Sequence, residues 1–262
     1  MAVLALDRVY PFELGIPNRV FGSASGRYEV RTCTVAGQPV RSRADCTIAV
    51  EHDSGLLESA DTVVVPACDI GMTLGGELPA PVRAAFARIR PGARIVAICT
   101  GSFVLAAAGL LYGRPATTHW READRFRRAF PRVLLDPFVL YVDDGDVLTS
   151  AGAAAGLDVC LHLVRRDHGS AVANAGARRC VVPPFREGGQ AQYIEQPVPP
   201  ATSAGTAGVG GGAVRRLGTM RQRSWPLLHS LRRPVAQSNS VESGPDTAVA
   251  GCRSRFRAAG CD

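Results

Sequence analysis

Apolar runs alternate with amphipathic stretches over residues 1–166, and most runs end near a turn residue. Short runs rich in Val, Ile, Ala and Leu predict β-strands, whereas apolar residues three and four apart predict helices. The predicted strands cover residues 2–6, 28–35, 46–50, 62–65, 95–98, 138–142 and 147–150, and the predicted helices cover 11–21, 82–90, 103–111, 120–130 and 153–166. This alternation predicts an α/β sandwich of three layers with a mainly parallel sheet.

The most informative position is Cys99, which directly follows the predicted strand 95–98. Thr100, Gly101 and Ser102 carry turn and cap chemistry, and an Ala-rich helix follows them. At such a strand-to-helix corner the side chain is pushed out of the sheet edge, and the first N–H groups of the helix favour a thiolate. Ligands of α/β folds also bind beyond the carboxyl ends of the strands. Cys99 is therefore a candidate nucleophile or redox-sensing thiol, or else an elbow residue retained for packing.

Two further residues are candidates to act with this thiol. His119 could serve as a general base for Cys99 or hydrogen-bond a ligand, and its structural alternative is a capped histidine at the start of the helix 120–130. Asp158, within the apolar helix 153–166, is an acidic candidate that could bind a ligand. Its structural alternative is a hydrogen bond at a helix end or between helices.

Composition limits the possible classes of protein. With 262 residues, 46% of them hydrophobic and 20% charged, the chain can build one sizeable core. Its apolar runs are shorter than the ~20 residues of a membrane span. Asp7 and Arg8 interrupt the apolar start before a leader forms, so we expect a cytoplasmic protein without membrane contact. The eight cysteines have no CxxC pair and no zinc-like spacing, so we expect free thiols, no metal and no cofactor.

Positive charge is concentrated in the last part of the chain. The net charge is +7, and all 30 basic residues are arginine. Residues 201–262 hold nine arginines against three acidic residues, so they contribute +6 of that total and leave the rest nearly neutral. A Pro-rich linker is expected at 193–200, and the Arg/Gly/Ser-rich composition of 201–262 predicts a disordered tail. The body of the chain therefore gives no signal for nucleic-acid binding.

Three spaced segments carry a resemblance to a known family. Residues 97–120 (AICTGSFVLAAAGLLYGRPATTHW), 149–164 (TSAGAAAGLDVCLHLV) and 181–200 (VVPPFREGGQAQYIEQPVPP) resemble GlxA-type transcriptional regulators. In that family a PfpI-like, class I glutamine amidotransferase-like domain precedes an AraC-type helix-turn-helix domain. The resemblance implies that residues 1–192 form a flavodoxin-like sensor domain, that an unidentified small molecule is its effector, and that the protein is a homodimer.

The resemblance also implies roles for individual residues. Cys99 and His119 match the cysteine and histidine positions of the wider superfamily, and Glu13 stands where relatives carry an acid that contacts the elbow cysteine. Oxyanion-type donors would be the backbone N–H groups of Thr100 and Cys68. Superfamily members often have a glycine pair where this chain has Ala67 and Cys68, which weakens the case for a working amidase.

The chain departs from the family after residue 200. Two helix-turn-helix units need about a hundred residues with periodic apolar faces, whereas 62 residues without that pattern remain. We expect DNA binding to be lost, and one hypothesis is a shift of the reading frame near Pro200, which retranslation of the gene in the other two frames would test. Three functions stay open: a regulator's sensor domain, favoured here as non-catalytic; a cysteine-dependent hydrolase, amidase or lyase using Cys99 and His119; and a non-functional remnant.

Overall fold

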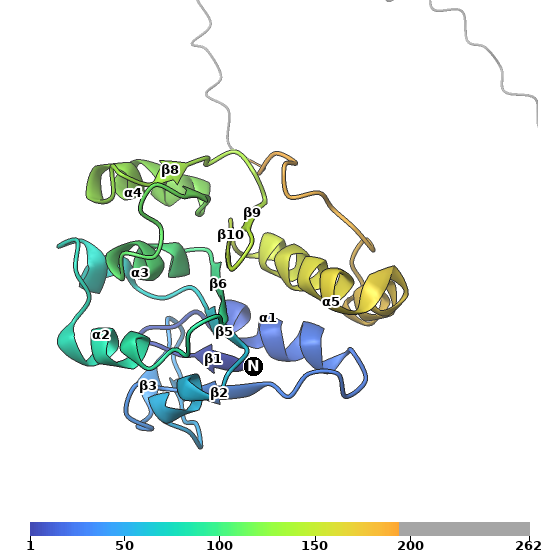
Figure 1. The fold of residues 1–262 in the computed structure, drawn as a ribbon, viewed down its shortest axis with the longest axis horizontal. Coiled ribbons are helices and arrows are strands. Elements are labelled where there is room, and N and C mark those ends of the chain that lie inside the picture. The colour runs from blue at the N-terminus through green and yellow to red at the C-terminus, as the bar shows by residue number, and fades with distance from the viewer. Residues whose placement is uncertain (194–262) are drawn as a thin grey trace, which may run out of the picture. The chain divides into compact units, whose positions relative to one another are not determined.

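The computed structural model describes residues 1–193, which are built around one six-stranded sheet (Figure 1). Its strand order is β2-β1-β5-β6-β10-β9, and every neighbouring pair is parallel except β9 with β10. The strands are β1 (Ala2–Leu4), β2 (Arg31–Cys33), β5 (Thr62–Val65), β6 (Arg94–Ile98), β9 (Tyr141–Asp144) and β10 (Val147–Ser150). The predicted mainly parallel sheet is confirmed.

Helices cover both faces of this sheet and complete the three layers (Figure 1). One face packs against α1 (Pro11–Gly22) and α5 (Ala154–Cys180). The other packs against α2 (Ala80–Ala87), α3 (Gly101–Ala107) and α4 (Ala123–Ala129). The central strands are buried on both sides, which explains why they read as continuous apolar runs rather than as alternating ones. The flavodoxin-like sandwich is therefore the observed architecture.

Smaller elements join these layers. Two short pairs lie outside the main sheet, antiparallel β3 (Val40–Arg41) with β4 (Thr47–Ile48) and parallel β7 (Pro115–Ala116) with β8 (Leu134–Leu135). Single 3₁₀ turns occupy Ser54–Glu58, Ile70–Thr73 and Trp120–Glu122. Within residues 1–193, no helix is both long and apolar enough to cross a bilayer.

Several predicted elements differ in detail from the observed ones. The strand at 46–50 is reduced to β4 and pairs with β3, whereas β2 joins β1 in the main sheet. The helix at 120–130 begins as a 3₁₀ turn, and the last helix continues past 166 to Cys180 with a break at Gly169. These errors arise where pairing partners and helix ends depend on distant segments. The remainder of the predicted linker, 194–200, and the predicted tail, 201–262, lie outside the described residues.

Parallel pairing places the carboxyl ends of β5, β6 and β10 at one edge of the sheet. Gly101, in the first turn of α3, approaches the end of β5 so closely that a Cβ there would overlap the Val65 carbonyl oxygen and lie 3.1 Å from that of Pro66. This contact sets the position of α3 on the sheet, because the crowding atoms belong to the backbone and cannot rotate away.

We expect Gly101→Ala to lower the free energy of unfolding by roughly 2–3 kcal/mol, because β5 or α3 must shift to admit the methyl group. The matched control is Gly15→Ala in α1, where no atom lies within 4 Å of the added Cβ. There the better helix propensity of alanine should raise the free energy of unfolding by up to about 1 kcal/mol. Urea denaturation of the two variants measures the difference, and equal stabilities would contradict this account.

Candidate functional site

Cys99 occupies the predicted elbow in a backbone conformation that L-residues rarely adopt. Its φ is 57°, in the left-handed region, directly between β6 and α3. Its N–H donates to the Ser150 carbonyl at 2.9 Å, and its own carbonyl accepts from the Ser102 N–H at 3.2 Å. The Ser102 hydroxyl lies 2.9 Å from the same carbonyl oxygen. The surrounding hydrogen bonds therefore hold the strained residue in place, a pattern typical of functional elbows.

The loop after β10 presses directly on this cysteine. Gly152, with φ 87°, passes so close that a Cβ on it would lie 2.7 Å from Cys99 Sγ and overlap Cys99 Cβ. The next residue, Ala153, has φ 47° and donates its N–H to Glu13 Oε1 at 3.3 Å. Glu13 is buried on α1. The structure thus brings Glu13 and Cys99 to the same loop, and Gly152 is a residue of this site that the sequence analysis missed.

The thiol does not have the acidity that the elbow pattern predicted. Burial, with a smaller contribution from the nearby carboxylate of Glu13, raises the pKa of Cys99 to about 12. Hydrogen bonding from Thr100 acts in the opposite direction but is outweighed. Cys99 is only 8% exposed, so loss of water from the thiolate dominates over the helix N–H groups. The predicted thiolate is wrong for this conformation, in which Cys99 is a protonated thiol at neutral pH.

The predicted oxyanion donors are also arranged differently. The Cys68 N–H donates to Thr100 Oγ1 at 3.1 Å, and that hydroxyl donates to the Cys68 carbonyl at 2.8 Å. Thr100 is the residue before α3, but its side chain makes no cap to that helix. Its hydroxyl instead ties the loop after β5 to the elbow. The expectation of a free Cys68 N–H is therefore wrong, because the amide is already satisfied inside the protein.

His119 takes the structural alternative considered for it. Its Nδ1 accepts the Arg121 N–H at 3.2 Å, so the histidine caps the turn that begins at Trp120. The ring stacks on the Trp120 indole with 5.8 Å between centroids. Burial lowers the pKa of His119, and Arg121 lowers it further against the opposing charge of Glu122. Among residues 1–193 the structure gives no hydrogen bond between His119 and Cys99, so no assembled dyad is present.

The Asp158 side chain pairs with Arg186 rather than with a residue of the elbow. Its buried carboxylate forms a bidentate ion pair with Arg186, one of whose hydrogen bonds measures 3.0 Å. The predicted inter-element hydrogen bond is thus realised as an ion pair to the segment after α5.

Two hydroxyls that the sequence analysis did not single out lie closer to the elbow. The hydroxyl oxygens of Ser102 and Thr118 are 2.8 Å apart, and the Thr118 hydroxyl lies 3.3 Å from the Cys99 carbonyl oxygen. Nothing in the local sequence distinguishes them from ordinary buried hydroxyls.

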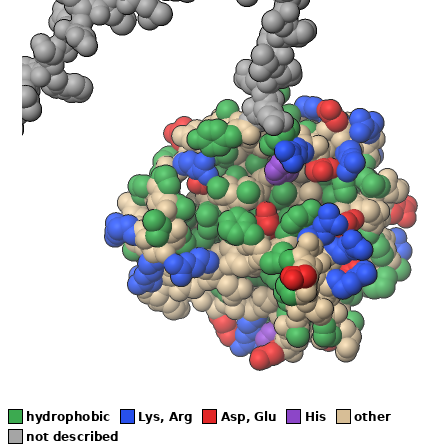
Figure 2. Space-filling model, turned by 180° about the vertical axis from the view of Figure 1, so that it is seen from behind, with side chains coloured by type: hydrophobic (Ala, Val, Ile, Leu, Met, Phe, Trp, Pro, Cys, Tyr) green, Lys and Arg blue, Asp and Glu red, His purple; other side chains and the backbone are tan. Residues whose placement is uncertain are grey.

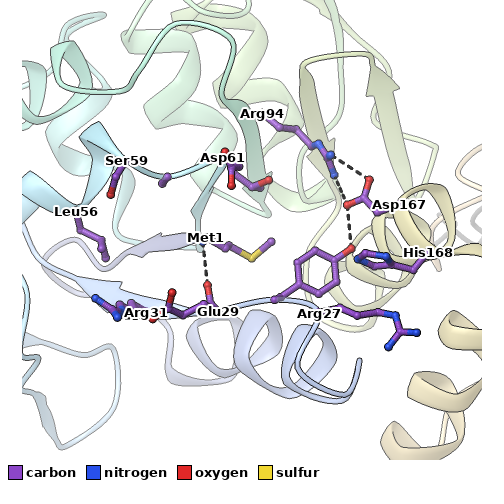
Figure 3. A pocket seen from close by; sticks show the side chains of 13 residues that line it. Met1, Arg27, Glu29, Arg31, Leu56, Ser59, Asp61, Arg94, Asp167 and His168 are labelled. Carbon is purple, nitrogen blue, oxygen red and sulfur yellow. Dashed lines mark hydrogen bonds and ion pairs between the residues drawn. The ribbon is translucent and has the colours of Figure 1, made fainter.

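A cavity of about 430 Å³ lies at the opposite edge of the sheet, where β5 and β6 begin (Figure 3). There Arg94 forms a bidentate ion pair with Asp167, both bonds measuring 3.0 Å, and Tyr28 donates to the same carboxylate at 2.9 Å. Burial raises the pKa of the Tyr28 hydroxyl. These groups satisfy one another, and none of the predicted site residues lines the cavity. Residues 1–193 group no three His, Cys, Asp or Glu side chains that could hold a metal ion.

These features define a flavodoxin-like α/β domain with a strained cysteine elbow at the carboxyl edge of its sheet. The chain belongs to the DJ-1/PfpI family, whose model matches residues 1–166. A solved structure with this fold, a THiJ/PfpI family protein from Pseudomonas syringae, is 26% identical with a TM-score of 0.60. The alignment covers 77% of this chain and 78% of that one.

Curated relatives confirm the resemblance to GlxA-type regulators. The HTH-type transcriptional regulator ArgR of Pseudomonas aeruginosa is 42% identical over 105 residues, which are 40% of this chain and 32% of ArgR. The HTH-type transcriptional regulator GlxA of Rhizobium meliloti is 46% identical over 71 residues, 27% of this chain and 21% of GlxA. The match therefore spans about a third of the length of ArgR.

The raised pKa of Glu13, caused by burial, gives a test of this site by protein stability. The folded state holds the Glu13 proton more tightly than the unfolded state does. That stabilisation is fully present below the ordinary pKa of 4.5 and is lost as the pH rises through the higher folded value. We therefore expect Glu13→Gln to be more stable than the wild type at pH 7, because the amide oxygen can still accept the Ala153 N–H without carrying a charge.

Urea unfolding at pH 4 and pH 7 measures this difference, which should shrink toward zero at the lower pH. Glu51→Gln, which neutralises an exposed carboxylate, is the matched control. A difference between Glu13→Gln and the wild type that is the same at both pH values would show that the buried carboxylate is not responsible.

Proposed function

We propose that this chain is a cytoplasmic, homodimeric sensor domain of the GlxA/AraC regulator type, that it binds a small molecule at the Cys99 elbow, and that it has lost sequence-specific DNA binding. The observation that carries the proposal is the state of the elbow. Its backbone has the left-handed conformation of an elbow, while the thiol is buried and protonated at neutral pH, and the Cys68 N–H, one of the two expected oxyanion donors, is already bonded. Such a site favours recognition over bond-breaking.

Three requirements of cysteine catalysis are unmet in this conformation. A nucleophilic cysteine needs a thiolate or an adjacent base, whereas burial keeps Cys99 protonated and the His119 Nδ1 accepts the Arg121 N–H. An oxyanion site needs unoccupied donors, whereas one of its two expected donors, the Cys68 N–H, is bonded to Thr100. The regulator relatives support the same conclusion, since ArgR and GlxA are both transcriptional regulators by name.

A cysteine-dependent hydrolase, amidase or lyase is the second candidate function. The left-handed backbone of Cys99 and the buried Glu13 beside the same loop favour it, because strain of this kind is common where a side chain must face a substrate. Binding of a substrate that displaced Gly152 or Thr100 could expose the thiol. A non-functional remnant is the third possibility, and it predicts that neither binding nor turnover is found.

A thermal-shift screen followed by product analysis separates these functions. The full chain is heated with small amides, aldehydes, isonitriles and amino acids, one at a time. We expect a compound at 100 times its Kd to stabilise the fold by about 2.7 kcal/mol and raise the Tm by roughly 5–10 °C. Mass spectrometry should recover that compound unchanged. Turnover that disappears in Cys99→Ser but persists in Cys46→Ser, which alters an exposed thiol, would establish the enzyme instead.

The surface of the described residues supports the proposed loss of sequence-specific DNA binding. Figure 2 shows basic and acidic side chains beside one another on the right of the face it presents. On α4 and the turn before it, Arg125 pairs with Glu122 and Arg127 pairs with Asp124, both at 3.3 Å. DNA-reading surfaces instead present unneutralised basic groups to the phosphates. The excess positive charge of the chain falls in residues 201–262, outside the described part.

We expect the full chain to bind DNA without sequence preference. Fluorescence anisotropy with a duplex from the region upstream of its own gene, and with a scrambled duplex of equal length, should give the same affinity for both. Both affinities should fall steeply between 50 and 200 mM salt, as the release of counterions by arginine requires. Tighter binding to the native duplex, by tenfold or more at fixed salt, would contradict the loss of a DNA-reading module.

A further inference from the structure

The last described residues form a strap along the carboxyl edge of the sheet. The C-terminal strap, residues 186–192, runs beside the segment that leads into β9. The Leu140 N–H lies 2.7 Å from the Gly188 carbonyl oxygen and 3.0 Å from that of Gln190, and the Gln192 N–H donates to the Phe138 carbonyl at 2.7 Å. Val139 and Ala191 form an antiparallel bridge. The strap therefore acts as an extra, irregular strand next to the elbow edge.

The beginning of the strap is fixed by charge. The Arg186 guanidinium pairs with the buried Asp158 carboxylate on α5, and the Arg186 carbonyl accepts the Tyr141 hydroxyl at 3.3 Å. A buried carboxylate that has lost its water requires such a partner, so this ion pair makes the strap part of the folded domain. Asp158, considered above as a ligand-binding candidate, is thereby an anchor for the segment that closes the site.

The end of the strap is fixed by one side chain, Gln192, which is 9% exposed. Its Nε2 lies 2.8 Å from the Pro137 carbonyl oxygen and 3.0 Å from those of Thr118 and Val139, and its Oε1 accepts the Trp120 N–H at 3.2 Å. An amide is the side chain suited to this position, because it supplies two donors and an acceptor together. These contacts join the strap to both sides of His119.

The segment 117–120, which Gln192 contacts, also forms hydrogen bonds with the elbow. The Thr118 carbonyl faces Gln192, while the Thr118 hydroxyl lies 3.3 Å from the Cys99 carbonyl oxygen and 2.8 Å from Ser102. A continuous set of hydrogen bonds therefore runs from the strap, through one threonine, to the strained cysteine. Each of its members is buried, so each bond is costly to break without replacement.

We propose that Gln192 is a positioning residue that locks the segment 117–120 against the Cys99 elbow, so that access to the thiol and the environment of His119 depend on the placement of the C-terminal strap. The strap also leads into residues 193–262, and its role in coupling ligand binding to those residues rests on the proposed sensor function. As a control on access to Cys99 it is independent of that function. Release of the strap opens the elbow locally, without unfolding the sheet.

Two substitutions at Gln192 test this role. Gln192→Ala leaves the Trp120 N–H and the Pro137 and Thr118 carbonyls without their partner. Gln192→Glu replaces the amide donor by a carboxylate oxygen, which repels those carbonyls. The matched control is Gln190→Ala, because the Gln190 side chain is exposed and only its backbone N–H and carbonyl form hydrogen bonds within the described residues.

The first readout is the rate at which N-ethylmaleimide modifies Cys99 in the full chain at pH 8, followed by mass spectrometry of its peptide. We expect both Gln192 variants to raise this rate about tenfold, the factor that corresponds to losing hydrogen bonds to a buried amide. Gln190→Ala should leave the rate unchanged. Cys33 and Cys160, which are buried elsewhere in the core, should react as slowly as in the wild type.

The second readout is the pKa of His119 by NMR titration, with Arg121 and Glu122 as its charged neighbours. Burial lowers this pKa in the wild type, so hydration of the segment 117–120 should move it up toward its ordinary value. The ring-proton chemical shifts of His168, which lines the cavity at the opposite edge of the sheet, should not change at fixed pH. A merely structural role for Gln192 would not single out His119 in this way.

Unchanged Cys99 modification and an unchanged His119 pKa in both variants would overturn the proposal. Equal acceleration at Cys99, Cys33 and Cys160 would also overturn it, since it would mean general destabilisation. The measurements use neither an effector nor DNA. A failed thermal-shift screen would therefore count against the sensor function and leave the role of Gln192 standing, whereas a negative result here would leave the sensor function standing.

Discussion

The left-handed backbone of Cys99, held between the ends of β5 and β10, is the constraint on which the carboxyl edge of the sheet depends. Gly101 must approach the β5 backbone for α3 to start there, and Gly152 must pass over the thiol for β10 to connect to α5. Neither position has room for a side chain. Strain at one residue is thus stabilised by close packing around it, which is possible because hydrogen bonds with β10, Ser102 and Thr118 converge on its N–H and carbonyl.

The packing that builds the elbow also suppresses its reactivity. Water is excluded from the thiol, and the buried carboxylate of Glu13 adds a negative charge nearby, so the pKa of Cys99 rises to about 12. At pH 8 the thiolate fraction is on the order of 10³-fold below that of an ordinary cysteine. A change that admits water or displaces the surrounding loops would reverse this. The site is therefore sensitive to how its covering segments are placed, which suits a sensor better than a permanently active enzyme.

Those covering segments come from distant parts of the chain. The loop after β5 is tied to the elbow through Thr100, the segment 117–120 through Thr118, and the C-terminal strap through Gln192. Each attachment uses a buried polar side chain that bonds to backbone groups, and Thr118 also bonds to the Ser102 hydroxyl. Backbone carbonyls move with their segments, so a displacement of one covering segment changes the hydrogen bonds of the next. This arrangement links the last described residues to the cysteine without any direct contact between them.

The sequence by itself determined the layers of the fold and the elbow. Buried strands such as β5 and β6 are continuous apolar runs, and the step from β6 through Cys99 to α3 is local, so periodicity and turn chemistry suffice to predict them. The state of the site was decided by tertiary structure. Whether Cys99 ionises depends on how completely α1 and the loop at Gly152 exclude water from it, and whether the Cys68 N–H is available depends on a hydroxyl 32 residues away. Burial and hydrogen-bond partners are properties of residues brought together by folding, and no local pattern records them.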